Sequence, residues 1–366
     1  MGLLCFLTGS RASSRGSKVA PQGHSATRTP HWTASTGSLH DGLRFLGRAF
    51  GDGIDDGGHH RSGERRPFCS GAFTDHLKRE DKTASLEVEL PETGALVSLI
   101  CVADGHGGAQ TSSWIAEHVL GLIAARAGDA SSDALQRACV AAFAQASTSV
   151  KALTDGAGSL NLGGSTLTVL ILNHKLREVT CANVGDSEAL LVHAEGYENL
   201  STSHRLDHND DERQRVRACG FKIARAADPD GNPGGPLRAW PGGLAVTRGI
   251  GDGDCAYVTP TPALRTVLAP PSGGVLVICS DGVWDCLSTK HVARMMIKPS
   301  NLWDSPQHAA RAIVKRAVRQ GGLFDDVSAV TLFIDAADPR NHAHGLQPLS
   351  GSQERQGKLS SEDSLL

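Results

Sequence analysis

This chain of 366 residues lacks three features, and each absence excludes a class of protein. It has no run of eighteen apolar residues, so the sequence predicts no transmembrane segment. A formal net charge of −3 and a pI near 6.6 leave no basic footprint, so we expect no nucleic-acid partner. The 9 cysteines include no C-x-x-C pair, which argues against a zinc site and favours a reducing compartment. We therefore expect a soluble intracellular protein of the cytoplasm, the nucleus or both.

The first forty residues also lack acidic side chains, because the first one in the chain is Asp41. They are basic and rich in hydroxyl groups, a composition typical of organellar transit peptides as well as of disordered tails. Residues 1–67 as a whole show no sustained periodicity and too little apolar character to fold alone. We predict a disordered N-terminal extension there, with targeting to a plastid or mitochondrion as the alternative, and a disordered polar tail over residues 337–366.

Between these segments, residues 68–336 have the pattern of a globular domain. Short apolar runs rich in β-branched residues and bounded by Gly, Asp or Asn predict strands over residues 95–103, 165–172, 178–183, 188–193, 274–279 and 328–334. Helical periodicity predicts helices over 109–125 and 133–153, and a third from the N-cap Ser305 to Gly321. The strands come in adjacent pairs with the helices set apart. The sequence therefore indicates an α+β domain with antiparallel sheets.

Aspartates spread along the whole chain lie mostly where these apolar runs break. They are Asp81, Asp104, Asp281, Asp285 and Asp325. Carboxylates gathered from separate strand ends are suitable ligands for hard divalent cations, which take oxygen donors. Each Asp-Gly pair alone is also compatible with an ordinary turn, because Asp-Gly is a common turn pair. The repetition of the order strand, Asp, Gly after two different strands favours a metal-dependent hydrolase.

Placed in order, the motifs resemble those of the type-2C metal-dependent serine/threonine protein phosphatases, most closely the plant-type members. The resemblance covers about residues 68–336. It rests on segments 101–108, 164–166, 182–187, 204–206, 236–244, 247–252, 277–285 and 324–331. It implies two antiparallel β-sheets packed face to face and flanked by α-helices, which is a four-layer sandwich.

The resemblance further implies an enzyme that hydrolyses phosphoserine and phosphothreonine on proteins by a metal-activated water, without a phosphoenzyme. Two Mg²⁺ or Mn²⁺ ions are implied, and the matching ligands are Asp81, Asp104, the backbone carbonyl of Gly105, Asp281 and Asp325. His106 matches the residue that protonates the departing serine or threonine oxygen. The implied partners are phosphorylated proteins, and we expect the chain to be a monomer.

Other positions of the site match the family less completely. Glu80 matches an acid that orients metal-bound water. Many family members carry an arginine where this chain has His76, so we expect Lys78 or Arg79 to supply the cation that binds phosphate. Asp285 matches a position linked to a third, weaker metal, but Asn161 replaces its usual acidic partner.

The remaining features leave alternatives open. Asp186 and Asp252 are interpreted as structural residues whose carboxylates bind backbone amides in turns. Residues 204–235 match a variable flap near the active site, or else form a solvated helix over 211–217. The same site would also serve a hydrolase of small phosphate esters or nucleotides. A regulatory pseudophosphatase is disfavoured, because no core metal aspartate is missing.

Overall fold

The structure is a computed structural model that describes residues 44–50, 70–153, 160–228, 230–297 and 305–337. The extensions predicted for residues 1–67 and 337–366 lie mostly outside the described residues. In the part of the chain that is described, no helix has the length and apolar character needed to cross a lipid bilayer.

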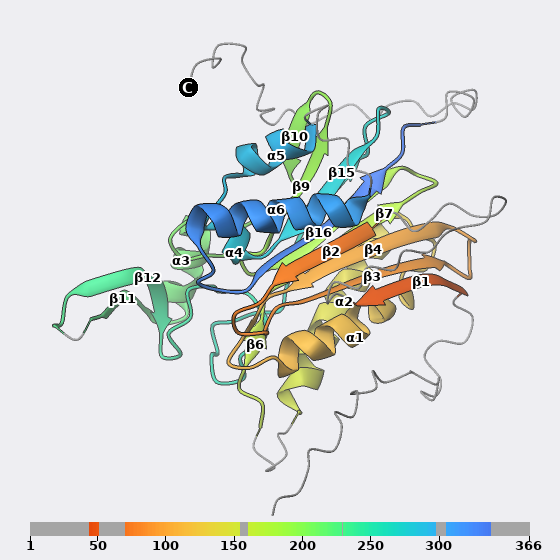
Figure 1. Ribbon diagram of the computed structural model, residues 1–366. Coiled ribbons are helices and arrows are strands. Elements are labelled where there is room, and N and C mark those ends of the chain that lie inside the picture. The colour runs from red at the N-terminus through yellow and green to blue at the C-terminus, as the bar shows by residue number, and fades with distance from the viewer. Residues whose placement is uncertain (1–43, 51–69, 154–159, 229, 298–304, 338–366) are drawn as a thin grey trace, which may run out of the picture. The chain divides into compact units, whose positions relative to one another are not determined.

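Most strands belong to two antiparallel sheets (Figure 1). The six-stranded sheet has the order β1-β3-β4-β7-β8-β14, with strands, in that order, at Arg44–Phe50, Lys82–Glu89, Leu96–Ala103, Leu167–Asn173, Glu178–Val184 and Ala263–Leu268. The five-stranded sheet has the order β10-β9-β15-β16-β2, with strands at Gly196–Asn199, Glu188–His193, Gly274–Cys279, Val327–Ile334 and Ser70–Asp75.

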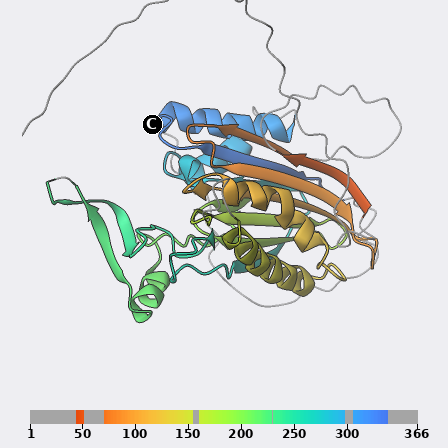
Figure 2. The same cartoon turned by 90° about the horizontal axis from the view of Figure 1, so that it is seen from below.

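Helices cover the outer faces of both sheets, as Figures 1 and 2 show. α1 (Gln110–Ala124) and α2 (Ser132–Lys151) share a core with the six-stranded sheet. α5 (Thr289–Ile297) and α6 (Pro306–Gly321) share a second core with the five-stranded sheet. A third core lies between the two sheets. The predicted α+β fold, a four-layer sandwich of two antiparallel sheets flanked by helices, is confirmed.

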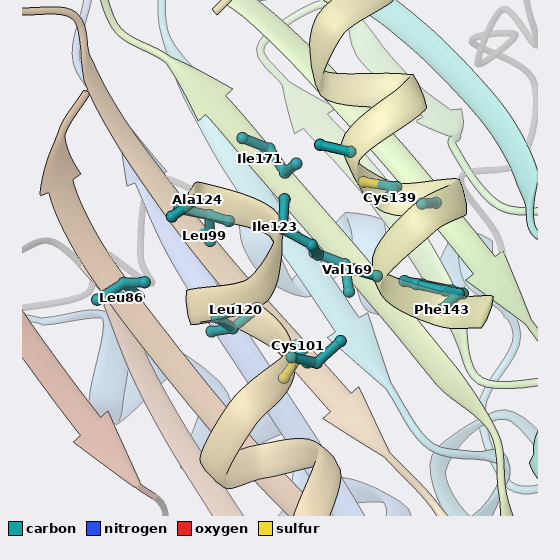
Figure 3. Close-up of a cluster of buried hydrophobic side chains, with 14 of the residues drawn as sticks. Leu86, Leu99, Cys101, Leu120, Ile123, Ala124, Cys139, Phe143, Val169 and Ile171 are labelled. Atoms are coloured by element: carbon teal, nitrogen blue, oxygen red, sulfur yellow. The ribbon is translucent and has the colours of Figure 1, made fainter. Parts of the chain in front are cut away.

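Strand β4 shows why the central runs are apolar throughout. Leu99 and Cys101 pack in the core beneath α1 and α2, where Figure 3 shows them near Leu120. Ile100 and Val102 point to the opposite face and pack in the core between the sheets. Because both faces of the strand are buried, every position favours an apolar residue.

Helix α6 begins and ends where the sequence signals predicted. Ser305 is the N-cap, and its side chain accepts a hydrogen bond from the backbone N–H of His308. Pro306 is the first helical residue, where its missing N–H has no intrahelical partner to lose. Gly322 is the C-cap with a φ of 87°, a conformation that favours glycine.

Several elements were not predicted from the sequence: β1, β2, β3, β10, β14 and α5. β1 lies within residues 1–67 and pairs along β3, so the six-stranded sheet begins before residue 68. Within residues 204–235, the segment expected to match a flap, α3 (Asp210–Ala218) confirms a helix over 211–217, but Glu212 and Val216 of this helix are buried rather than solvated. β11 (Lys222–Ala227) and β12 (Pro233–Trp240) then form a hairpin that projects away from the two sheets in both views (Figures 1 and 2).

Candidate active site

Two of the predicted metal-binding aspartates lie side by side at one edge of the six-stranded sheet. β3 and β4 are antiparallel, and Lys82 at the start of β3 pairs with Ala103 at the end of β4. Asp81 and Asp104 are the next residues beyond this pair. The register therefore brings both carboxylates to the same end of the sheet.

The five-stranded sheet brings the other two predicted ligands to the same place. Asp281 follows β15 and begins the short helix α4 (Asp281–Trp284), while Asp325 precedes β16, the partner of β15. The charge of Asp281 contributes to a raised pKa of Asp104, and the charge of Asp325 contributes to a raised pKa of Asp281. Carboxylates from both sheets thus meet at the seam between them, although they lie far apart in the sequence.

These carboxylates are buried and crowd one another, and both effects make them hold protons more tightly. Burial raises the pKa of Asp81 to about 6. Burial, followed by the charges of Asp81, Asp281 and Asp186, raises the pKa of Asp104 well above its ordinary value. Burial and then the charge of Asp285 raise the pKa of Asp281. A divalent cation would stabilise the ionised form of such a group of acids.

Asp186 lies beside the same group of acids, and its interpretation as a structural turn residue stays a prediction. It follows β8 and is 8% exposed. Burial and the charge of Asp281 raise the pKa of Asp186 to about 7. The sequence did not place this residue beside the predicted ligands, because segment 182–187 has the pattern of an ordinary turn.

The chemistry of these donors fits divalent cations. Asp81 is 2% exposed, and its Oδ2 has no hydrogen-bond partner. A buried carboxylate oxygen in that state is costly unless a cation or an ordered water binds it. The donors are all oxygens, as Mg²⁺ and Mn²⁺ prefer. Within the described residues, no three His, Cys, Asp or Glu side chains form a ready-made metal-binding group, so the two-cation centre stays a proposal.

Asp326, beside the predicted ligand Asp325, organises the loop that carries Asp81. It accepts hydrogen bonds from five consecutive backbone N–H groups, those of Leu77, Lys78, Arg79, Glu80 and Asp81. Burial alone would raise the pKa of Asp326, but these donors outweigh it and lower that pKa to about 2. This loop connects β2 of one sheet to β3 of the other, so Asp326 also stabilises the connection between the two sheets.

Both residues expected to bind phosphate lie on this loop. The Nζ of Lys78 is 2.7 Å from Oδ2 of Asp325, and this hydrogen bond is the main cause of a raised pKa for Lys78. Arg79 is exposed and has a φ of 66°, which is uncommon for a residue with a side chain. Nδ1 of His76, at the position of the family arginine, is 3.9 Å from Oδ2 of Asp326.

Glu80 contacts the glycine-rich loop that follows Asp104. Its Oε1 accepts a hydrogen bond of 2.7 Å from the N–H of Gly108, and its backbone carbonyl accepts one from Oγ of Ser112. A Cβ on Gly105 would lie 2.7 Å from the carbonyl oxygen of Glu80. Only glycine at position 105 therefore allows the backbone there to run so close to that of Glu80.

A small sheet of three two-residue strands holds His106. β5 (Gly105–His106) pairs with β6 (Gly164–Ser165), which pairs on its other side with β13 (Ile250–Gly251). Nε2 of His106 lies 2.6 Å from Oδ1 of Asp252, the residue after β13. Burial opposes charge on the ring, but the hydrogen bond and charge of Asp252 prevail and raise the pKa of His106. The Asp252 carboxylate thus binds a side chain, which corrects our expectation that it binds a backbone amide.

Arg205 is a cation that sequence reasoning did not place in the site, although it lies in the matching segment 204–206. Its Nη1 is 2.9 Å from Oδ1 of Asp285, 3.6 Å from Oδ2 of Asp186 and 3.8 Å from Oδ2 of Asp281. A positive charge therefore already faces the residue that matches the third metal position.

Asn161, which replaces the usual acidic partner of Asp285, makes its contacts elsewhere. Its Nδ2 donates to Oγ1 of Thr111 at 2.8 Å, and its Oδ1 accepts from the N–H of Gly163 at 3.1 Å. The side chain thus joins its own loop to α1, and the weakened third metal site stays a prediction.

A buried carboxylate ties the flap to the rest of the domain. Glu212 of α3 is 3% exposed and accepts hydrogen bonds from Arg215, Thr247 and Arg248. Burial would raise the pKa of Glu212, but these donors lower it to about 2. Thr247 and Arg248 lead directly into β13 and Asp252, so the base of the flap and the support of His106 share one segment.

The chain matches known proteins over most of its length. A family model described as "Protein phosphatase 2C" matches residues 58–322. "Probable protein phosphatase 2C 5" of Arabidopsis thaliana is 37% identical over 244 residues, which cover 65% of this chain and 54% of that protein. "Probable protein phosphatase 2C 33" of Oryza sativa subsp. japonica is 36% identical over 272 residues, covering 72% of this chain and 59% of that protein. The chain thus spans little more than half the length of these relatives.

A solved structure supports the fold. The serine-threonine phosphatase 2C from Toxoplasma gondii has a TM-score of 0.59 and 18% sequence identity, covering 74% of this chain and 96% of that chain. At this identity the likeness bears on the fold alone.

Proposed function

Because the chain belongs to the protein phosphatase 2C family, we propose that it hydrolyses phosphoserine and phosphothreonine esters on proteins. One observation carries the proposal. Aspartates from both sheets converge at one edge of the sandwich, and His106 stands two residues after one of them, Asp104. The matched region contains Asp81, Asp104 and Asp281, while Asp325 lies just beyond its end at residue 322.

The predicted ligands would bind two divalent cations. They are Asp81, Asp104, the backbone carbonyl of Gly105, Asp281 and Asp325. Mg²⁺ or Mn²⁺ held there supplies Lewis-acid chemistry, which neutralises phosphoryl oxygens and activates water. The partnerless Oδ2 of Asp81 and the raised pKa of Asp104 support this use of the site.

The other side chains would bind, orient and protonate the substrate. His106 has a 32% exposed side chain, so its ring is accessible to a departing serine or threonine oxygen, to which it would donate a proton. Glu80 would orient water beside the Gly108 amide that it binds. Lys78 is the stronger candidate for binding phosphate, because its ammonium group already lies at the predicted ligand Asp325. Arg79 is exposed on the same loop and is the second candidate.

The pair Lys78 and Arg79 can be separated by competition with inorganic phosphate. We expect Lys78→Gln to raise the inhibition constant of phosphate and the KM for a phosphopeptide, because it removes a charge-assisted contact. Arg79→Gln serves as the matched variant. If only Arg79→Gln weakens phosphate binding, the assignment passes from Lys78 to Arg79.

The proposal is tested with the purified chain on three kinds of substrate: phosphoserine peptides, nucleotides and p-nitrophenyl phosphate. We expect hydrolysis of the peptides and the aryl ester only with Mg²⁺ or Mn²⁺, and its loss on exhaustive chelation. Preference for nucleotides would favour the hydrolase of small phosphate esters. Binding of phosphopeptides without turnover, at any metal concentration, would favour the pseudophosphatase.

A further inference from the structure

We propose that Asp252 is the positioning residue of His106, and that it fixes the orientation and tautomer of the ring for proton donation. This inference deepens the proposed function and depends on it. The observation that carries it is the 2.6 Å hydrogen bond between Nε2 of His106 and Oδ1 of Asp252, two residues that are 146 positions apart.

The small sheet brings the two residues together. In its register Gly164 pairs with His106 on one side and with Gly251 on the other. Asp252 follows Gly251 directly, so its side chain reaches across the middle strand toward the ring. The pairing of β5, β6 and β13 thus brings His106 and the carboxylate of Asp252 together.

The backbone leaves space for this carboxylate. A Cβ on Gly164 would lie 2.2 Å from Oδ2 of Asp252, and one on Gly249 would lie 3.2 Å from the same atom. Asp252 itself has a φ of 51°, a left-handed conformation that costs free energy for a residue with a side chain. The left-handed backbone of Asp252 and the two glycines beside its carboxylate indicate that the local fold is arranged to place this carboxylate.

The carboxylate of Asp252 does not have the surroundings of a structural acid. It is 3% exposed, and its Oδ2 has no hydrogen-bond partner. Asp326, by contrast, is surrounded by five backbone donors. Burying a carboxylate with so few partners is unfavourable, so its contact with His106 is the feature that accounts for its presence.

The contact also bears on the roles of the ring nitrogens. When the Asp252 carboxylate is ionised it can only accept, so Nε2 of His106 then carries the hydrogen of this bond. The nitrogen left to pass a proton to the substrate is then Nδ1. Without Asp252 the ring would be free to turn and to change tautomer.

The test compares two leaving groups in a double-mutant cycle. Asp252→Asn, which is nearly isosteric, should lower kcat for a phosphoserine peptide roughly 10- to 100-fold, by analogy with partners that orient metal-bound histidines. Its effect on p-nitrophenyl phosphate should be small, because that leaving group needs no proton, and KM should stay near the wild-type value. Adding Asp252→Asn to His106→Gln should cause no further loss. Asp254→Asn, the same change at an exposed position two residues on, is the control.

Equal losses on both substrates, or losses that add to those of His106→Gln, would overturn the inference and leave Asp252 a structural residue. If His106→Gln itself shows no dependence on the leaving group, the proton-donor assignment in the proposed function fails instead. A third measurement is independent of turnover and of variant folding. ¹⁵N NMR of the wild-type imidazole should show a hydrogen on Nε2 of His106, and a ring protonated only on Nδ1 would contradict the inference.

Discussion

Asp104 and Asp326 lie at the same edge of the sandwich, yet their surroundings are opposite. Asp326 accepts hydrogen bonds from five backbone N–H groups, which lower its pKa to about 2. Asp104 has other carboxylates around it, and burial together with their charges raises its pKa. The protein alone satisfies the first carboxylate, whereas a positive charge from outside would stabilise the ionised form of the second. The contrast separates acids that build the site from acids suited to bind a cation.

The largest expected effect comes from removing a charge in the crowded group. Asp104→Asn keeps the shape of the side chain but weakens cation binding. We expect turnover with Mn²⁺ to fall roughly 10³-fold or more, because such ions contribute several kcal/mol and each 1.36 kcal/mol is tenfold in rate. In EDTA its melting temperature should equal or exceed that of the wild type, since the repulsion is relieved. A melting temperature that falls together with the activity would show that Asp104 is structural.

The opposite outcome is expected for the satisfied acid. Asp326→Ala leaves five N–H donors without their acceptor, so we expect the free energy of unfolding in urea to fall by about 3 kcal/mol or more, given that each unsatisfied buried donor costs about 1–3 kcal/mol. Asp326→Asn keeps one acceptor oxygen and should lose less. Wild-type stability in the alanine variant would remove the distinction between the two acids.

Glu212 extends the comparison to a satisfied carboxylate outside the site. Its pKa is about 2 in the folded chain, against an ordinary value of 4.5. The unfolded chain binds the proton more tightly, so the stability from Glu212 is fully present above about pH 4.5 and is lost as the pH falls toward about 2. In Glu212→Gln, the change in unfolding free energy over this pH range should be smaller than in the wild type by up to about 3 kcal/mol. Urea titrations at several pH values measure this slope, and an unchanged slope would contradict the assignment.

The smallest effect is expected at Asp285, which is the C-cap of the short helix that begins at Asp281. Its side chain is 59% exposed and pairs with Arg205. Exposed ion pairs contribute about 0–1 kcal/mol, so Asp285→Asn should change the unfolding free energy by less than about 1 kcal/mol. Turnover should change far less than in Asp281→Asn. A loss as large as that of Asp281→Asn would place Asp285 among the essential ligands.

The fold was predictable wherever the apolar and polar residues of an element follow a clear pattern. β9 and β15 have the predicted bounds, because β9 is an apolar run with the polar ends Glu188 and His193, and β15 is an apolar run that begins at Gly274 and is followed by Ser280. β3, with Lys82, Ser85 and Glu87 among its residues, lacks that pattern although it lies inside the sheet. β14 is an edge strand with an exposed Leu268, so no clear alternation marks it.

The convergence of the predicted ligands was easier to predict than that of their supports. Asp104, Asp281 and Asp325 were each marked by a predicted strand boundary and a matching motif, whereas Asp81 was placed by the family resemblance alone. The structure brings these acids to one end of the sandwich, and their roles as metal ligands stay predictions. The contact between His106 and Asp252 depends on pairing between strands of two residues, which are too short to leave a periodic signal. The roles of Asp186, Arg205 and Asp326 likewise arise only when distant loops meet.

The seam between the sheets has a further consequence for the whole domain. Because the proposed ligands come from both sheets, a cation bound there would act as a cross-link between the two halves of the sandwich. Its binding free energy would then be linked to the docking of the sheets, and free cation would raise the unfolding temperature in proportion to the logarithm of its concentration. The concentration of Mg²⁺ or Mn²⁺ around the protein would thereby set its lifetime as well as its rate.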